Sequence, residues 1–186
     1  MTSQHLITVS DHARELLSDA LVWDMTLPWE PDAVDETTLP RFKAAGVDVI
    51  SLTVNMPTSD ATVKHIAAVL ADVRAHADTM TLIHGTDDVW EARKAGKLAL
   101  TLNLQETNPL DGELAMIDLY YQLGIRHMLL AYNQKNRVGD GCAERTDAGL
   151  SRFGVRVVQE MNRVGMLVDG THTGYRTTME AMEVSN

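Results

Sequence analysis

The sequence has few of the features that mark secreted, membrane or nucleotide-binding proteins. Its 186 residues include one cysteine, Cys142, so no internal disulfide can form, which agrees with a reducing compartment. No stretch approaches the roughly 20 apolar residues that a membrane-spanning helix needs. The N-terminal residues contain neither a basic leader nor the apolar segment of a signal peptide. These absences predict a cytoplasmic protein.

Positive charge is also scarce. The chain has 16 Lys and Arg residues against 26 Asp and Glu residues, giving a formal net charge of -10. Such a field repels the phosphates of nucleic acids and anionic membrane surfaces, so we expect neither as a partner. The 45% hydrophobic content is ordinary for a globular protein. The length fits a single domain over residues 1–186.

Phosphate-binding glycine loops are missing as well. Neither GxGxxG nor a Walker sequence occurs, although a doubly wound nucleotide-binding sheet would normally carry such a loop after its opening strand. The apolar run at residues 21–23 leads instead into WDMTLPWEPDA, where Pro28 and Pro31 predict a long irregular loop. This pattern favours a barrel over a nucleotide-binding fold.

Four helix-like segments end in glycine and are followed at once by an apolar run. We expect each glycine to adopt the left-handed conformation that ends a helix. The four are Gly46, Gly96, Gly124 and Gly165. With the run at 21–23, this predicts five main strands, and residues 80–83 are a possible short extra strand. Alternating helices and strands predict a parallel sheet joined by crossover helices.

The helices are expected over residues 11–19, over residues 62–77 and from Tyr175 to the end of the sequence. On 62–77 one face is apolar and is predicted to be buried. That face consists of Val63, Ile66, Ala67, Leu70 and Val73.

The length is too short for a whole barrel. A complete (β/α)8 barrel takes about 250 residues. The predicted fold class is therefore α/β, an incomplete TIM-type (β/α)8 barrel with roughly the first five strands and their helices. Its last strand would have an open edge, so we expect self-association or a need for the missing half.

A polar residue follows each predicted strand. In parallel barrels these carboxyl ends converge on the face that carries the active site. The residues are Asp24, Asn55, Glu106, Asn133, Asp169 and His172. Taken singly, each is better explained as a loop or turn residue. Together they predict one site, in which a carboxylate and an imidazole are ligand types suited to zinc. Five other histidines are expected to be structural or exposed, and Cys142 to be a loop thiol without a role. Those histidines are His12, His65, His76, His84 and His127.

Several short motifs, above all GLSRFG and EMNRVGMLVD, carry a resemblance to the membrane (renal-type) dipeptidase family of zinc peptidases that covers most of the chain from about Leu21 onward. The pieces that carry the resemblance are GLSRFG, EMNRVGMLVD and the histidine after them, with GKLALTLNLQE upstream and LVWDMTLPW as a degraded form of the family's opening motif. The family is known as (β/α)8 barrels that hold two zinc ions and hydrolyse dipeptides. By position, Glu106 resembles the bridging carboxylate, His172 a ligand of the second zinc, and Asp24 a supporting residue of the opening motif.

Other positions depart from the family's pattern. Thr26 and Pro28 stand where the opening motif supplies histidine and aspartate to the first zinc, so at most one zinc is expected. Tyr132 replaces a substrate-contacting histidine and is the candidate catalytic residue, able to donate a hydrogen bond to a substrate oxygen. The family's remaining ligands would lie beyond Asn186.

The resemblance therefore implies a metal-dependent dipeptidase-type hydrolase with a small dipeptide-like substrate and a homodimeric assembly. The isolated chain is expected to be inactive. Two alternatives remain open. One is a non-catalytic barrel that binds a small ligand or a partner subunit, and the other is a half-barrel that only dimerises.

Overall fold

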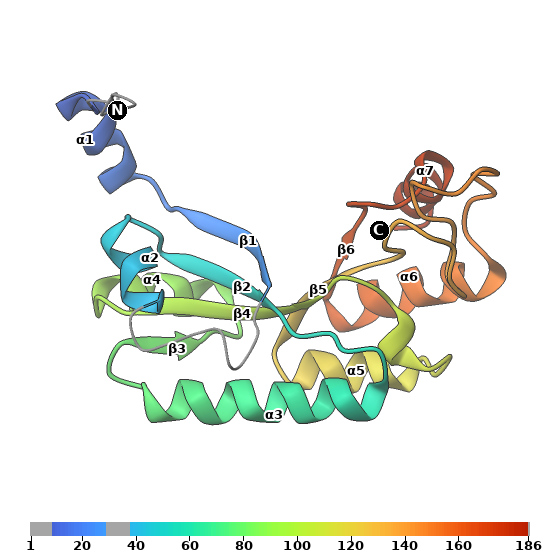
Figure 1. Ribbon diagram of the computed structural model, residues 1–186, viewed down its shortest axis with the longest axis horizontal. Helices are drawn as coiled ribbons and strands as arrows, with labels where there is room; N and C mark the ends of the chain where they lie inside the picture. The colour runs from blue at the N-terminus through green and yellow to red at the C-terminus, as the bar shows by residue number, and fades with distance from the viewer. Residues whose placement is uncertain (1–8, 29–37, 186) are drawn as a thin grey trace, which may run out of the picture.

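The computed structural model describes residues 9–28 and 38–185, in which helices and strands alternate (Figure 1). The strands are β1 (Trp23–Pro28), β2 (Val49–Thr53), β3 (Met80–Leu82), β4 (Leu98–Leu104), β5 (Ile125–Leu129) and β6 (Leu167–Asp169). The helices are α1 (Asp11–Asp19), α2 (Thr38–Ala44), α3 (Ser59–Ala75), α4 (Thr86–Lys94), α5 (Ala115–Gln122), α6 (Arg152–Val164) and α7 (Tyr175–Val184), with a short 3-10 helix η1 (Asn108–Leu110). None of the helices in this part of the chain is long and apolar enough to cross a membrane.

The strands form one parallel sheet in which β1, β2, β4, β5 and β6 follow one another. Strands that are successive in this row are joined by helical segments, which confirms the predicted incomplete (β/α)8 barrel. The extra strand expected near Met80 is also present, as β3. Within residues 9–28 and 38–185, no strand pairs with the outer edge of β6, as predicted.

The short strand β3 lies off this row. It pairs with residues 98–100 of β4, while β5 pairs with residues 102–104 of the same strand. Because β2 occupies the other edge of β4, β3 and β5 share one edge end to end. Gly124, just before β5, lies so close to Leu82 that a Cβ there would be 3.1 Å from its side chain. β3 therefore fills the amino end of the sheet only.

The opening strand differs from the prediction. β1 begins at Trp23 and continues to Pro28, over residues that were expected to form a loop. A register shift between Asp24 and Leu27 lets β1 follow β2 past an irregularity. Pro28 is tolerated because it ends an edge strand, where a missing N–H breaks no ladder bond. Pro31, in the remainder of the predicted loop, lies outside the described residues.

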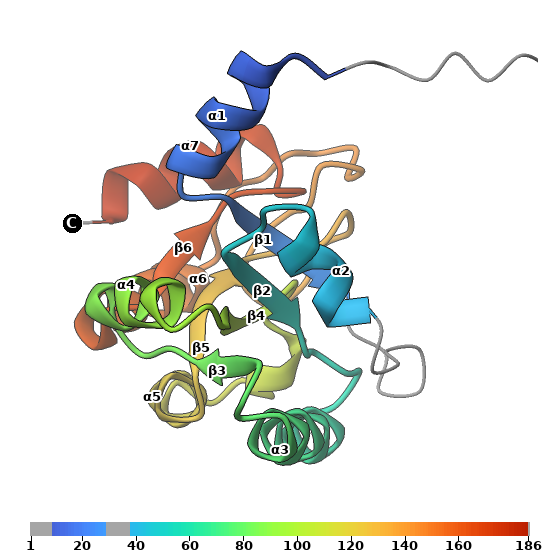
Figure 2. The ribbon, with the colours of Figure 1, turned by 90° about the vertical axis from the view of Figure 1, so that its left-hand side faces the viewer.

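The main hydrophobic core lies between the sheet and helices α3, α5 and α6. The even-numbered leucines of β4, from Leu98 to Leu104, are buried in it and pack with residues of those helices such as Ile66, Ile117 and Val157. Figure 2 shows α3 and α5 on the same side of the sheet. The odd-numbered residues of β4 face the other way, toward the inside of the partial barrel. β4 is thus buried on both faces, as expected of a parallel strand.

The buried face of α3 is rotated from the predicted one. Ile66 and Val73 are buried as expected, but Ala67 is exposed. Thr62, His65 and Val69 are buried instead. The hydroxyl of Thr62 accepts the Met56 N–H at 2.9 Å, which satisfies a polar side chain on the inward face and permits the rotation. The hydrophobic pattern alone does not reveal that bond.

The four predicted helix-ending glycines all have left-handed backbones. Their φ angles are 88° at Gly46, 71° at Gly96, 106° at Gly124 and 84° at Gly165. Each glycine directly precedes the residues that lead into a strand, so these turns set where β2, β4, β5 and β6 begin.

Candidate functional site

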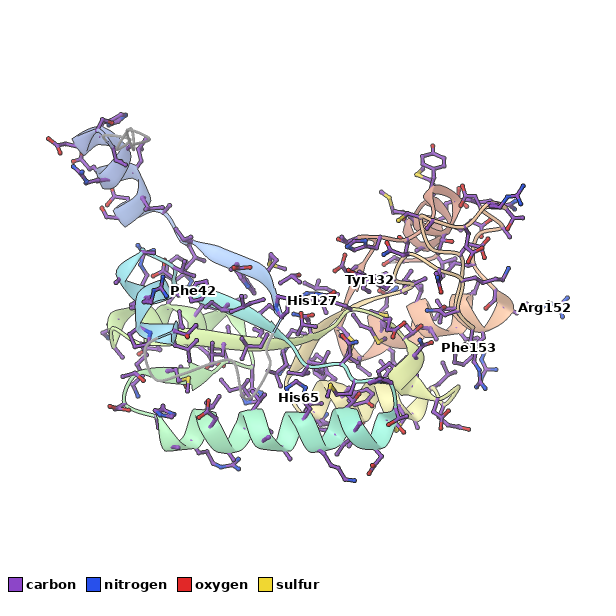
Figure 3. The ribbon with its side chains drawn as sticks, viewed as in Figure 1. Phe42, His65, His127, Tyr132, Arg152 and Phe153 are labelled. Carbon is purple, nitrogen blue, oxygen red and sulfur yellow. The ribbon has the colours of Figure 1, made fainter. Side chains whose placement is uncertain are left out.

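The predicted site residues come from three adjacent strand ends. Glu106 follows β4, Tyr132 follows β5 and His172 follows β6, and these strands are neighbours in the sheet. We call the loops that follow the carboxyl ends of β4, β5 and β6 the rim. Figure 3 shows Tyr132 near the point where β5 gives way to the loop beside β6. The Tyr132 ring lies against the His172 imidazole, with centroids 4.3 Å apart and planes inclined by 33°. The structure therefore brings these two predicted residues into contact.

Residues 139–143, which we call the bridging segment, tie the Tyr132 and His172 loops together. The Cys142 N–H donates to the His172 carbonyl at 2.7 Å. On the other side, the Ala143 N–H donates to the Asn133 carbonyl at 2.8 Å. One stretch of backbone thus fixes the spacing of both loops.

Close packing at Gly141 is part of this arrangement. Gly141 forms an antiparallel bridge with Thr173. A Cβ at position 141 would lie 2.6 Å from the Gln134 nitrogen, and closer still to the carbonyl group of Asn133. Backbone atoms cannot rotate away as a side chain can, so only glycine fits without moving the loops.

Asp140 anchors the bridging segment to α7. Its buried carboxylate accepts the Ala148 N–H at 2.7 Å and the Thr146 hydroxyl at 3.2 Å, and pairs with the Lys135 ammonium at 3.0 Å. Its carbonyl accepts the Thr177 hydroxyl of α7 at 2.9 Å. The Ala148 N–H and Lys135 hold the pKa of the Asp140 carboxyl below its ordinary value. This carboxylate stabilises the loop without belonging to the rim.

Asn133 lies at the centre of the contacts around His172. Its side-chain oxygen is 2.9 Å from His172 Nδ1 and accepts the Cys142 thiol at 3.3 Å. Both Asn133 and His172 have positive φ angles, 57° and 61°. The sequence indicated that Asn133 follows a strand, but nothing in the spacing predicted that Cys142 returns to it.

Glu106 is held from its own loop. One of its carboxylate oxygens accepts the Asn108 amide at 2.7 Å. The next residue, Thr107, donates its hydroxyl to the Leu130 carbonyl at 2.9 Å, and the Asn136 amide donates to the same carbonyl at 2.8 Å. These bonds join the loop after β4 to the loop after β5, so Glu106 is positioned beside the Tyr132 strand end.

A polar layer inside the partial barrel supports the rim from below. The amide of buried Asn103 donates to the Ser51 hydroxyl at 3.0 Å, and its oxygen accepts the Thr53 hydroxyl at 3.0 Å. Asn55, predicted at the rim, accepts the Gln105 N–H at 2.9 Å. These bonds fix β2 against β4 and satisfy polar groups that would otherwise be costly to bury.

Asp24 and Asp169, both predicted at the carboxyl ends of strands, act as turn residues, although Asp24 lies near the start of β1 rather than after a strand. Asp24 accepts the N–H of Thr26 at 3.1 Å, and Asp169 accepts the N–H of Thr171 at 2.8 Å. Each bond runs from a side chain to the backbone two residues on, which is an Asx turn. The structure thus supports the simpler of the two interpretations that the sequence left open for these positions.

His127 of β5 is a buried interior residue, as its expected structural role implies (Figure 3). Burial lowers its pKa, while the Asp169 carboxylate and a hydrogen bond to the Met25 carbonyl act in the opposite direction. Burial thus favours the neutral form of His127, which links β5 with β1 through the Met25 carbonyl.

The donors at the rim fit part of a two-zinc site. Glu106 supplies carboxylate oxygen and His172 supplies imidazole nitrogen, both of them zinc ligand types. Thr26 does not replace a ligand, since its hydroxyl donates to the Met25 carbonyl at 2.7 Å, and Pro28 has no donor atom. Among the described residues, no group of three or more His, Cys, Asp or Glu residues could hold a metal ion. Thr26 and Pro28 thus do not fit the family's first zinc, and for the second zinc the described residues offer only Glu106 and His172 as candidate ligands.

A row of parallel strands separated by helices, with polar side chains at the strand carboxyl ends, defines a partial (β/α)8 barrel with its candidate site on the face that this class uses. The sequence profile of the membrane dipeptidase family, peptidase family M19, matches residues 18–186. The chain belongs to this family.

Individual relatives agree with this assignment. An uncharacterized dipeptidase of Schizosaccharomyces pombe is 35% identical over 103 residues, covering 53% of this chain and 25% of the relative. An amidohydrolase from Pseudomonas aeruginosa has a solved structure with a TM-score of 0.86 and 30% identity, covering 93% of this chain and 52% of that one.

A metallopeptidase from Rhodobacter sphaeroides, solved with a phosphinate mimic of the dipeptide L-Ala-D-Ala, has a TM-score of 0.76 at 15% identity and supports the fold. It covers 89% of this chain and 62% of that one. The matches thus span 52% and 62% of these solved relatives and a quarter of the S. pombe protein.

Proposed function

We propose that this chain forms part of a metal-dependent dipeptidase whose substrate is a dipeptide or a related small amide. The observation that carries the proposal is the contact of the Tyr132 and His172 rings after β5 and β6. Glu106 follows β4, the strand on the other side of β5. Family membership supports hydrolase chemistry. The dipeptide mimic bound by the R. sphaeroides relative supports the substrate class.

In this proposal Glu106 and His172 hold the metal, which we take to be zinc. When bound, the metal would polarise the scissile carbonyl and lower the pKa of a water molecule. Tyr132 donates its phenolic hydrogen to the substrate carbonyl oxygen and stabilises the negative charge that develops there. Packing against the His172 ring limits the orientations that the Tyr132 ring can adopt.

Thr26 and Pro28 restrict this chemistry. Because they supply no ligands for a first zinc, we expect at most one zinc for each chain and negligible dipeptidase activity from the 186 residues alone. Elemental analysis after purification without chelator measures the number of zinc ions bound to each chain. Two tightly held zinc ions, or dipeptide turnover near an ordinary enzyme rate of about 10 s⁻¹, would contradict it.

Zinc titration against a chromophoric chelator tests the ligands. We expect Glu106→Gln and His172→Gln each to weaken zinc binding by at least about tenfold, as the loss of a ligating group should. Glu15→Gln and His12→Gln are matched controls, because both parent residues are exposed on α1, which precedes the first strand of the sheet. Equal affinities in the wild type and both rim variants would refute the proposed ligands.

A second function is favoured by the same opening strand. Thr26 and Pro28 cost nothing to a protein that binds a small ligand or a partner subunit without hydrolysis. Under this alternative, dipeptides would bind without added zinc, and isothermal titration with and without chelator separates the two cases.

Assembly is also a proposal. The outer edge of β6 pairs with no strand within the described ranges, so a second copy of the chain is an expected partner. Sedimentation at several protein concentrations measures this, and a monomer at every concentration would contradict the homodimer.

A further inference from the structure

The hydrogen-bond partner of His172 Nδ1 indicates which nitrogen of the imidazole carries the hydrogen. Nδ1 lies 2.9 Å from the side-chain oxygen of Asn133, within hydrogen-bonding distance. The oxygen of an amide accepts and cannot donate. The bond therefore requires the hydrogen of a neutral His172 to be on Nδ1.

The Cys142 thiol supports this assignment of the amide. Its sulfur donates to the same Asn133 atom at 3.3 Å. A thiol is a donor and its sulfur is only a weak acceptor, so the amide oxygen of Asn133 is a better partner for Cys142 than the amide nitrogen is. The bridging segment fixes the geometry, since the Cys142 N–H also holds the His172 carbonyl.

With hydrogen on Nδ1, the lone pair of the imidazole is on Nε2. A histidine that binds a metal through one nitrogen usually donates from the other to an oxygen, and this second bond fixes both the tautomer and the ring orientation. We propose that Asn133 is a positioning residue that holds His172 in the Nδ1–H tautomer and so leaves the Nε2 lone pair available to the proposed metal. The metal part of this inference rests on the proposed function; the tautomer part does not.

The backbone at position 133 explains why asparagine suits this role. Its φ of 57° is a left-handed conformation that asparagine, aspartate and glycine adopt more readily than other residues. Gly141 packs against the backbone of Asn133, and the Asn133 carbonyl accepts the Ala143 N–H. These contacts fix the backbone from which the Asn133 side chain extends. An acceptor and a left-handed backbone are thus combined in one residue.

The same backbone preference supplies a matched pair of variants. Asn133→Gly keeps the left-handed conformation and removes the acceptor. Asn133→Asp keeps both the conformation and an acceptor oxygen, and Cys142→Ser keeps a hydrogen-bond donor in place of the thiol.

Two measurements separate positioning from stability. Long-range ¹H–¹⁵N NMR at about pH 8.5, above the usual range of histidine titration, reads the tautomer of His172, with His172→Gln assigning its signals among the seven histidines. Zinc affinity is measured by chelator competition. We expect the Nδ1–H form in the wild type, in Asn133→Asp and in Cys142→Ser. Asn133→Gly should lose this preference and bind zinc about 10-fold to 100-fold more weakly.

The outcomes distinguish this inference from the function on which it rests. A wild type with hydrogen on Nε2, or Asn133→Gly with an unchanged tautomer, overturns the role of Asn133. A wild type in the Nδ1–H form that binds no zinc supports the tautomer assignment and refutes the metal site instead. Equal zinc affinity in the glycine and aspartate variants overturns the link between the two.

Discussion

Replacing Gly141 by alanine should separate the two loops that carry Tyr132 and His172. The φ of Gly141 is not in the left-handed region, so alanine is allowed by the backbone and the obstacle is steric. The added Cβ would lie 2.6 Å from Gln134 N and closer to the Asn133 carbonyl group, far inside ordinary contact. Inserting atoms into packed structure usually costs about 1–3 kcal/mol, and fixed backbone neighbours favour the upper end of that range.

Urea unfolding followed by tryptophan fluorescence measures this cost. With a denaturant slope of about 2 kcal/mol per M, a loss of about 3 kcal/mol lowers the midpoint by about 1.5 M. Gly85→Ala is the matched control, because no atom lies within 4 Å of the Cβ it would add. Its midpoint should move by less than about 0.3 M. If the two variants unfold at the same midpoint, the bridging segment does not constrain the rim as described.

Three further changes test other parts of the structure. Asp140→Asn should destabilise the chain by about 1–3 kcal/mol at neutral pH through the loss of charged hydrogen bonds. Because the folded-state pKa of Asp140 is lowered, its contribution is complete above the ordinary aspartate pKa of about 3.9 and disappears as the pH falls through the folded value. The difference between variant and wild type in urea should therefore shrink in acid, and a constant difference would contradict this. Burial lowers the pKa of His127, so the wild type should lose stability as the pH falls below about 6.5, while His127→Gln should show a flatter dependence in thermal melts at about pH 7.5 and 5.5. A steeper slope in the variant would be evidence against this role. Leu102→Ala should cost about 2–5 kcal/mol, since Leu102 is fully buried between the sheet and its helices; calorimetry showing less than about 1 kcal/mol would place it outside the core.

The elements that the sequence predicts well are those determined by local chemistry. The turns at Gly46, Gly96, Gly124 and Gly165 follow from the freedom of glycine to end a helix. The apolar runs after the first three are almost wholly buried, whereas Leu167, in the run after Gly165, is 61% exposed. The family resemblance is likewise confirmed over most of the chain. Periodicity was less reliable on α3, where the bond between Thr62 and Met56 rotates the buried face.

The sequence predicted which residues belong to the candidate site better than it predicted the hydrogen bonds that join them. Glu106, Tyr132 and His172 were each predicted from strand ends and from resemblance, and the structure places Tyr132 against His172. The bond between Asn133 and Cys142 joins residues in a glycine-rich loop that follows no period, so no pattern could predict it. Strand β1 was placed too early because the irregularity after Asp24 breaks its alternation.

The end-to-end arrangement of β3 and β5 on one edge of β4 has a consequence for how this protein tolerates change. Residues 80–97 form a detour at the amino end of the sheet, remote from every side chain discussed at the rim. A peptide tag or a length variation inserted near Gly85 should leave the proposed zinc binding unchanged. The same insertion between Tyr132 and Leu150 should abolish it. These two segments should therefore tolerate insertions to very different degrees.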